Sequence, residues 1–414
     1  MLAAIAIESV NRHHRGGLRD SENGERLATK MNNSPQPDWN PTSPEVQRDQ
    51  RAACDEMRRR CPVAYSKFFG WSLFRHEDVM RVLLDHETFS SAVSRHLNVP
   101  SGMDQPEHTA YRRIIEPYFS AKRVAAFETV CRDLAAKLVQ GLNSRPEVEF
   151  MADAALPFAV QVQCAFLGWP AALHEPLVRW NQRNQEATLA QNRKALSELA
   201  REFEAIIDDQ LDARMQCKAG PETDLTASLM REEVRGRALS NEEVASIVRN
   251  WTAGEIGTIS AANGILAQYL ATHADLQNQL RARPDFLPAA IEEILRIHGP
   301  LVSNRRITKR PVEIGGRKIA AGERVTIMWI SANRDERVFT DPDAFRLDRD
   351  QSQNLLWGAG IHVCPGMPLA QREMRVFLEE LLSHTHEIAL VPERTARLAV
   401  YPASGYASLP LRVR

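Results

Sequence analysis

The sequence predicts a mostly α-helical protein with a minor β component, and three observations support this fold class. Apolar residues recur at helical spacing over most of the chain. Patterns typical of strands are confined to residues 63–74 and 312–327 and to a mixed segment at 387–414. The 414 residues, 43% of them hydrophobic, are enough for one large domain or for two or three smaller ones.

Each expected element follows from a local pattern. Helices are expected, in chain order, at residues 43–60, 76–85, 105–119, 124–142, 156–167, 177–215, 241–273 and 289–298. The first begins with the cap-like Ser43-Pro-Glu, and the longest begins with a capping box of Ser240 and Glu243. A break near 191–193 divides residues 177–215 into two helices. Turns are expected at residues 315–316, 321–322 and 402–405.

Composition excludes several classes of function. The net charge of −1 gives no reason to expect a nucleic acid or a membrane surface as partner. Six cysteines without a CxxC pair argue against a zinc site or a disulfide framework, and they are typical of a reducing cytoplasm. No apolar run approaches the ~20 residues of a membrane span. We expect residues 1–42 to be a disordered tail, within which Met31 is an alternative start.

The most informative stretch is the loop Trp357-Gly-Ala-Gly-Ile-His-Val-Cys-Pro-Gly366. Gly358, Gly360 and Gly366 allow positive φ angles and leave room for a large flat group. A helical pattern resumes just after Cys364, so the positive end of that helix favours a thiolate. A lone cysteine is more often a small buried hydrophobe. In this loop, however, the thiolate is well placed to be an axial ligand of haem iron.

The whole loop matches the haem-binding signature of the cytochromes P-450: aromatic, Gly, x, Gly, x, His, x, Cys, x, Gly. Trp357 takes the place of the usual phenylalanine. The chain therefore resembles this family, which implies a single haem domain over residues 43–414. The resemblance also implies haem b (iron protoporphyrin IX) bound through the Cys364 thiolate, with Trp357, Gly358 and Gly366 against the cofactor.

A pair of charged residues resembles the Glu-x-x-Arg motif of the family. Glu293 and Arg296 are neighbours at i, i+3 on a helix, and an isolated pair of this kind is usually an ordinary surface ion pair. Residues 333–349 resemble the Asp-Pro-x-x-Phe segment to which the family's pair is bound. The resemblance therefore implies that Glu293 and Arg296 have a structural role and support the cysteine loop from behind.

Four basic residues are expected to bind the two haem propionates. His108 and Arg112 lie at i, i+4 on one helical face and resemble the family's HxxxR. Arg306 matches an arginine of the central sheet, and His362 lies two residues before the cysteine. Any one of them alone is as well explained as a solvated charge. Together they would neutralise two carboxylates through charge-assisted hydrogen bonds.

The oxygen side departs from the family pattern. Thr258 matches the expected alcohol, but Gly257 stands where the family usually has an acid. Gly254 is expected to let the helix widen around dioxygen. Glu255 lies three residues before Thr258, on nearly the same face, and the hydroxyl and the carboxylate together would pass protons to a bound peroxide through water. The alternative is that Glu255 pairs with an arginine or faces a polar loop.

The substrate pocket is placed by family position. It should be lined by residues 91–103, 180–189 and 251–258 and by five named residues: Ala253, Gly254, Leu301, Val302 and Ser404. The first of these loops is short, which favours a small or medium apolar substrate. The stretch 250–258 resembles a bacterial subgroup sometimes fused to a flavin and iron–sulfur reductase. Members of that subgroup hydroxylate or dealkylate aromatic and other small compounds.

The resemblance implies an oxygen-dependent monooxygenase, a soluble cytoplasmic enzyme that uses O2 and a separate ferredoxin- or flavodoxin-type electron donor with its reductase. Arg113, Arg372 and Arg375 are expected to form a basic docking patch for that donor, or else a merely solvated face. A peroxide-driven peroxygenase and a non-catalytic haem-binding sensor remain as alternatives. Pro365 lacks an N–H beside the sulfur, so Pro365→Ala should shift the iron potential little or upward.

Overall fold

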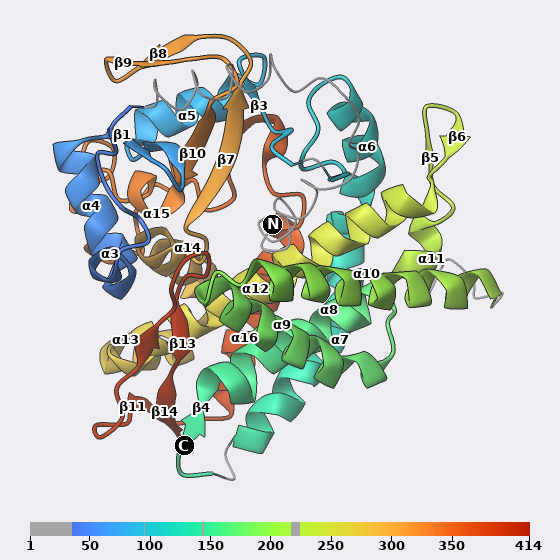
Figure 1. Ribbon diagram of the computed structural model, residues 1–414. Helices are drawn as coiled ribbons and strands as arrows, with labels where there is room; N and C mark the ends of the chain where they lie inside the picture. Colours follow the sequence, from blue (N-terminus) through green and yellow to red (C-terminus); the bar gives the residue numbers. More distant parts are fainter. Residues whose placement is uncertain (1–34, 95, 143–144, 217–223) are drawn as a thin grey trace.

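The computed structural model of the protein describes residues 35–414 except residues 95, 143–144 and 217–223 (Figure 1). The described helices are α3 (Pro44–Arg48), α4 (Gln50–Arg60), α5 (His76–Leu84), α6 (Glu107–Ile115), α7 (Ala121–Leu142), α8 (Leu156–Leu167), α9 (His174–Leu189), α10 (Arg193–Gln216), α11 (Leu225–Leu229), α12 (Asn241–Ala271), α13 (Ala274–Ala282), α14 (Leu287–His298), α15 (Trp329–Ala332) and α16 (Met367–Ser383). Short 3-10 or π turns lie between several of them. The predicted predominance of helices is confirmed.

The strands occupy much less of the chain. They are β1 (Val63–Ser66), β2 (Gly70–Leu73), β3 (Phe89–Ser90), β4 (Val148–Glu149), β5 (Glu233–Val234), β6 (Arg237–Ala238), β7 (Ser303–Thr308), β8 (Val312–Ile314), β9 (Arg317–Ile319), β10 (Arg324–Met328), β11 (Ile388–Leu390), β12 (Arg397–Leu398), β13 (Tyr406–Ser408) and β14 (Pro410–Val413). The main sheet has the order β1-β2-β10-β7-β3, in which only β2 and β10 pair in parallel. It forms one end of the molecule, with α5 beside it (Figure 1).

The long helix α12 crosses the centre of the molecule and organises the helical part (Figure 1). It packs against α8, α10, α14 and α16. Its start is the predicted capping box, in which the Ser240 hydroxyl accepts a bond from the Glu243 amide and the Glu243 carboxylate accepts one from the Ser240 amide. Helix α7 lies along α16, so α12, α16 and α7 enclose a common core. This arrangement determines which residues surround the cysteine loop.

Several boundaries differ from the sequence prediction for local reasons. Residues 43–60 form two helices, because Asp49 leaves helical geometry and its side chain caps α4 by accepting a bond from the Ala52 amide. The predicted break near 191–193 is confirmed between α9 and α10. No helix of the described residues is long and apolar enough to cross a membrane.

The folded domain begins before residue 43, where the sequence analysis placed the end of the disordered tail. Residues 1–34, including Met31, lie outside the described part of the chain. Asp38 is already part of the fold, because its amide donates to the Tyr65 carbonyl and its carboxylate accepts from the Tyr65 amide. Trp39 is buried against Phe69 and Phe74. These contacts place residues 38 and 39 in the folded domain.

Candidate functional site

The Cys364 loop connects the Asn333-to-Trp357 segment to α16 and is held by its own backbone. The Cys364 amide donates to the Trp357 carbonyl at 2.9 Å, and α16 begins at Met367, as the sequence predicted. Gly360 has a φ of +69°, and a Cβ there would lie 2.5 Å from the Leu83 carbonyl oxygen. Only glycine fits this position, because it tolerates both the left-handed backbone and the close approach of α5.

One expectation about this loop needs correction. Gly366 does not use a positive φ, because its φ is −79° and it serves as the N-cap of α16. At the sulfur, two opposite influences act. Burial raises the pKa of the Cys364 thiol to about 11, whereas the amides of Gly366 and Met367 at the start of α16 lower it, in the direction that the sequence predicted.

Behind the loop, Glu293 and Arg296 form a fully buried ion pair at one end of α14. Arg296 donates two bonds to the Glu293 carboxylate, at 2.8 and 3.0 Å, and both side chains are 0% exposed. Arg296 also donates to the carbonyls of Asn333 and Pro342. The pair thus contacts residues 333–349, the segment that the sequence analysis expected.

Each oxygen of the Glu293 carboxylate also accepts a further hydrogen bond. Arg349 donates to Oε1 at 2.7 Å and Gln351 donates to Oε2 at 3.0 Å. The link reaches the cysteine loop through Asn333, whose side-chain oxygen accepts from the Leu355 amide. Trp357 joins it as well, because its indole N–H donates to Glu292 on α14 at 2.9 Å. The loop is therefore anchored to α14 along its whole approach.

The four predicted propionate ligands are brought to this region by different elements. The rings of His108 (α6) and His362 are 4.2 Å apart between centroids. Arg112 donates to the Val363 carbonyl at 2.7 Å, which places it beside the cysteine. In β7, Arg306 is paired in register with Val325 of β10. Burial lowers the pKa of His362 to about 3, and the nearby positive charge of Arg306 contributes to this shift.

The unpaired donors in this cluster identify what is missing from it. Both ring nitrogens of His108 are buried and contact no partner in the described chain. Arg306 is buried with one bond, to the Arg305 carbonyl, and burial lowers its pKa to about 10. Buried donors and an uncompensated cation require an anion. The residues present therefore fit a flat group with carboxylates, as haem is.

Sequence reasoning missed one donor, Trp329 of α15. Its indole nitrogen is buried without a partner, and its ring would lie 3.8 Å from a Cβ at Gly358. It thus borders the cysteine loop with an N–H free to bind a cofactor. No motif marks this tryptophan, and only the pairing of β10 with β7 brings the end of β10 here.

On α12, the residues expected on the oxygen side are arranged as follows. The Thr258 hydroxyl donates to the Gly254 carbonyl at 2.6 Å, a bond from one helical turn to the next. A Cβ at Gly254 would meet nothing within 4 Å, so the space next to it is open. Ala253 is buried. The helix therefore presents a hydroxyl and an open position one turn apart.

Glu255 makes no direct hydrogen bond with Thr258, and its Oε1 atom is buried with no partner among the described residues. The carboxyl group lies near Glu373 of α16 and Cys131 of α7, each of which interacts with it electrostatically. No arginine of the described residues pairs with it. Side chains three residues apart on a helix point in directions that differ by about 60° around the helix axis. This difference turns Glu255 away from Thr258 and toward α16. Its role in a proton relay through water stays a prediction.

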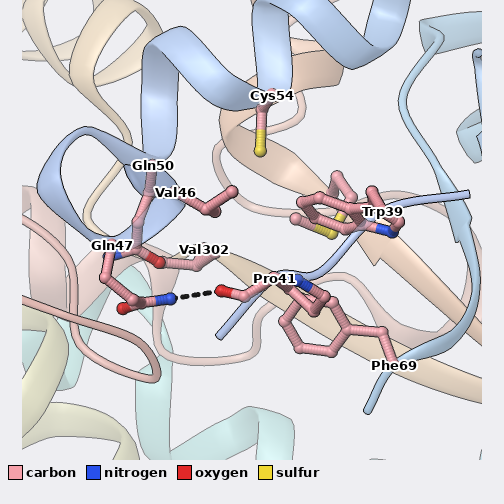
Figure 2. A pocket seen from close by; sticks show the side chains of 9 residues that line it. Trp39, Pro41, Val46, Gln47, Gln50, Cys54, Phe69 and Val302 are labelled. Atoms are coloured by element: carbon pink, nitrogen blue, oxygen red, sulfur yellow. Dashed lines mark hydrogen bonds between the residues drawn. The ribbon is translucent and has the colours of Figure 1, made fainter. Parts of the chain in front are cut away.

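The named pocket residues are dispersed. Ser404 donates to the Gly299 carbonyl at 2.5 Å, and the next residue, Gly405, lies against Ala261 of α12. Leu301 packs beside the main sheet. Figure 2 shows Val302 with Trp39 and other apolar residues around a hollow of about 10 Å³, roughly the space of one water. Val302 thus has a core role there, and its place in a substrate pocket stays a prediction.

Comparisons with known proteins agree with this geometry. The Cytochrome P450 family model matches residues 163–395. The chain is 33% identical to the cyclomarin C epoxidase CymV of Salinispora arenicola, over 80% of this chain and 88% of that protein. It is 32% identical to the erythromycin C-12 hydroxylase of Saccharopolyspora erythraea, over 79% of this chain and 85% of that protein.

Solved structures give the same result. The structure of cytochrome P450 CYP109Q5 from Chondromyces apiculatus superposes with a TM-score of 0.78 at 30% identity, covering 90% of this chain and 97% of that one. A mutant of P450 EryK in complex with erythromycin B gives 0.79 at 27% identity, covering 89% and 97%. The protein therefore belongs to the cytochrome P450 family, whose members are monooxygenases with a haem ligated by a cysteine thiolate.

Proposed function

We propose that Cys364 is the haem ligand and that the enzyme inserts one atom of O2 into a small or medium apolar, in some cases aromatic, substrate by hydroxylation or dealkylation. The observation that supports this assignment is the set of unpaired buried donors around the loop. Both ring nitrogens of His108 have no partner in the described chain, and the buried Arg306 forms no ion pair there. Haem b would supply two carboxylates and an iron ion together.

The chain's own residues then divide the work. When bound, the haem supplies the activation of dioxygen and the transfer of an oxygen atom. Arg112, Arg306, His108 and His362 hold the propionates. The Thr258 hydroxyl donates its one O–H to the Gly254 carbonyl. When it turns away from that carbonyl, it can donate this proton toward the oxygen side while its lone pair accepts a replacement proton from water. Ala253 keeps this part of α12 apolar and limits access of bulk water.

The proposal of a compact pocket is supported by how the loop at residues 97–99 is tied to α12. The Val99 amide donates to the Ser246 hydroxyl, which donates to the Leu97 carbonyl. Asn250 donates to both the Asn98 side chain and the Val99 carbonyl. A loop held at this many points is fixed against the first third of α12. The named relatives act on compounds of different kinds, so no particular substrate follows from them.

We further propose that electrons come from a ferredoxin- or flavodoxin-type donor in the cytoplasm. The five cysteines of the described residues are unpaired, which is typical of a reducing compartment. The basic patch predicted for docking is smaller than expected. Arg372 and Arg375 are both paired with Glu128, whereas Arg113 is exposed. Arg113 therefore carries more of the expected attraction to an acidic partner.

A peroxide-driven reaction is the second candidate, and the position of Glu255 favours it. Gly257 replaces the usual acid, and Glu255 does not contact Thr258. Peroxide already carries the electrons and protons that dioxygen would need from outside. Product formation with reductant, ferredoxin and O2, compared with hydrogen peroxide alone, separates the two reactions. Absence of product under both conditions would favour a non-catalytic haem sensor.

The role of Cys364 is tested by substitution. The reduced protein under carbon monoxide should show the red-shifted Soret band of a thiolate-bound haem, and Cys364→Ala should lose it completely. Cys164→Ala is the control, because this buried α8 cysteine lies in a separate cluster and should leave the band unchanged. A normal band in Cys364→Ala would refute the assignment. Compounds that shift the ferric spectrum from low to high spin would then identify the substrate class.

The role of Thr258 is tested next. Thr258→Ala should keep the carbon monoxide band and substrate binding, but lower product per O2 consumed, because proton delivery by one group contributes roughly 10²–10⁴-fold. Thr258→Ser retains the hydroxyl and is the matched control. Product and hydrogen peroxide are measured together with O2 uptake. Unchanged coupling in Thr258→Ala would exclude this hydroxyl as the proton donor.

A further inference from the structure

Glu255 and Glu373 form a pair of buried acids that nothing in the proposed reaction uses. Glu373 of α16 is 0% exposed, and neither of its carboxyl oxygens contacts a donor in the described chain. Glu255 Oε1 of α12 is buried and equally without a donor. The two carboxyl groups interact directly with each other across the α12–α16 contact.

No cation of the described residues forms a hydrogen bond with Glu373, although the buried Nε atom of Arg375 on the same helix also has no hydrogen-bond partner. The titratable groups that face it are thiols, Cys131 on α7 and Cys364 before α16. The nearby arginines of α7 and α16 are engaged elsewhere: Arg132, Arg372 and Arg375 pair with Glu128, Glu379 and Glu380. On the other neighbouring helices, α8 offers Cys164 and α14 offers Glu293, which is bound by Arg296.

Two carboxylates in such a place cannot both be ionised at low cost, so they retain protons. Burial, and next the charge of Glu255, raises the pKa of Glu373 well above its ordinary value of 4.5. Burial raises the pKa of Glu255 as well, and the neighbouring Glu373 carboxyl group opposes this shift in part. A proton shared between them satisfies two of the unpaired oxygens at once.

The pair is also coupled electrostatically to the haem ligand. The charge of Glu255 is one of the causes that raise the pKa of the Cys364 thiol. Coupling of this kind is reciprocal, so added negative charge at the iron–sulfur bond favours a proton on the pair. Adding an electron to the haem iron adds such a charge.

We propose that Glu255 and Glu373 form a shared-proton carboxyl pair that takes up a proton when the haem iron is reduced. One electron from the donor reduces the ferric iron to ferrous, and one proton from water binds the carboxylate of the pair. No other bond is made or broken. The inference rests on the proposed ligation of haem by Cys364. It gives Glu255 a role on the thiolate side of the haem, not on the oxygen side.

The test is the ferric/ferrous potential measured across a range of pH by spectroelectrochemistry. In the range where the oxidised pair is singly protonated, the potential should fall by up to about 59 mV for each tenfold drop in proton concentration. Glu255→Gln and Glu373→Gln should each remove this slope. Glu242→Gln is the matched control, because Glu242 is an exposed acid in the first turn of α12. A slope that persists in both variants would overturn the proposal.

A second measurement needs no variant to fold. The infrared difference spectrum of the reduced minus the oxidised protein should contain a protonated-carboxyl band that shifts in heavy water. Its absence would also overturn the inference, and its loss in Glu373→Gln would assign it. The carbon monoxide band of the same samples reports haem ligation separately. A sample with the thiolate band but no pH slope therefore contradicts the carboxyl pair while leaving the proposed function intact.

Discussion

Two buried sets of charged side chains flank the Cys364 loop, and they are built in opposite ways. On the α14 side, Glu293 receives bonds from Arg296, Arg349 and Gln351. On the α12 side, both carboxyl oxygens of Glu373 and Oε1 of Glu255 receive none from any donor in the described chain. A saturated network holds one geometry, whereas a carboxyl pair without such donors responds to charge. The comparison separates the part of the site that holds the loop from the part that can sense the iron.

The largest effect is expected where the saturated network is broken. Arg296→Ala leaves Glu293 buried without its main partner, and breaking a buried pair on one side costs about 3–5 kcal/mol of unfolding free energy. Because Arg296 also binds the carbonyls of Asn333 and Pro342, the cysteine loop should lose its support and the protein should bind little haem. Chemical denaturation and the haem content of the purified protein measure both effects.

The matched control for this change is Arg283→Ala. Arg283 also pairs with an acid, Asp285, but the pair is exposed on the surface. Exposed pairs contribute little, so stability and haem content should be nearly unchanged. Normal haem content in Arg296→Ala would mean that the loop does not depend on α14, and the contrast between the two sides would fail.

A smaller effect, with the opposite sign, is expected at the unpaired acids. Because folding raises the pKa of Glu373, the native state binds more protons than the unfolded state above pH 4.5. The stability contributed by the protonated pair is therefore full below 4.5 and is lost as pH rises through the folded-state pKa. Each pKa unit by which folding raises the Glu373 pKa corresponds to about 1.4 kcal/mol of unfolding free energy lost at high pH.

Glu373→Gln should remove this dependence. Its unfolding free energy should be nearly independent of pH over the range in which the unaltered protein becomes less stable, and above that range the variant should be the more stable of the two. Urea denaturation at a series of pH values measures the difference. Glu242→Gln should follow the unaltered protein, since its carboxyl group is exposed. Parallel curves for Glu373→Gln and the unaltered protein would show that the pair carries no folding-linked proton.

The saturated side was predictable from sequence, whereas the unpaired side was not. Glu293 and Arg296 are neighbours on one helix, and a short motif marks both them and the cysteine loop. Glu255 and Glu373 come from helices far apart in the chain, and only the packing of α16 against α12 brings them together. The helical pattern correctly placed Gly254, Glu255 and Thr258 on one long helix, but it could not show which neighbour faces Glu255.

The same limit explains the other departures. His108 and Arg112 were found because both lie on one helical face, while Trp329 depends on a sheet pairing that no local pattern shows. The tail boundary was misplaced because Trp39 is held by aromatic residues of the β1–β2 region and its ends, not by a helical pattern of its own. Local periodicity therefore predicts elements and motifs, and contacts between distant elements remain beyond it.

The smallest expected effect lies at Pro365, between the two sides. The amides of Gly366 and Met367 already lower the pKa of the Cys364 thiol, and the Met367 amide donates to the Cys364 carbonyl. Pro365→Ala supplies a further N–H in the same turn. If this N–H reaches the sulfur, the iron potential rises, and if it does not, the potential stays where it is. A clear downward shift in a redox titration, with the carbon monoxide band intact, would show that the proline tunes the ligand by its backbone geometry and not by its missing donor.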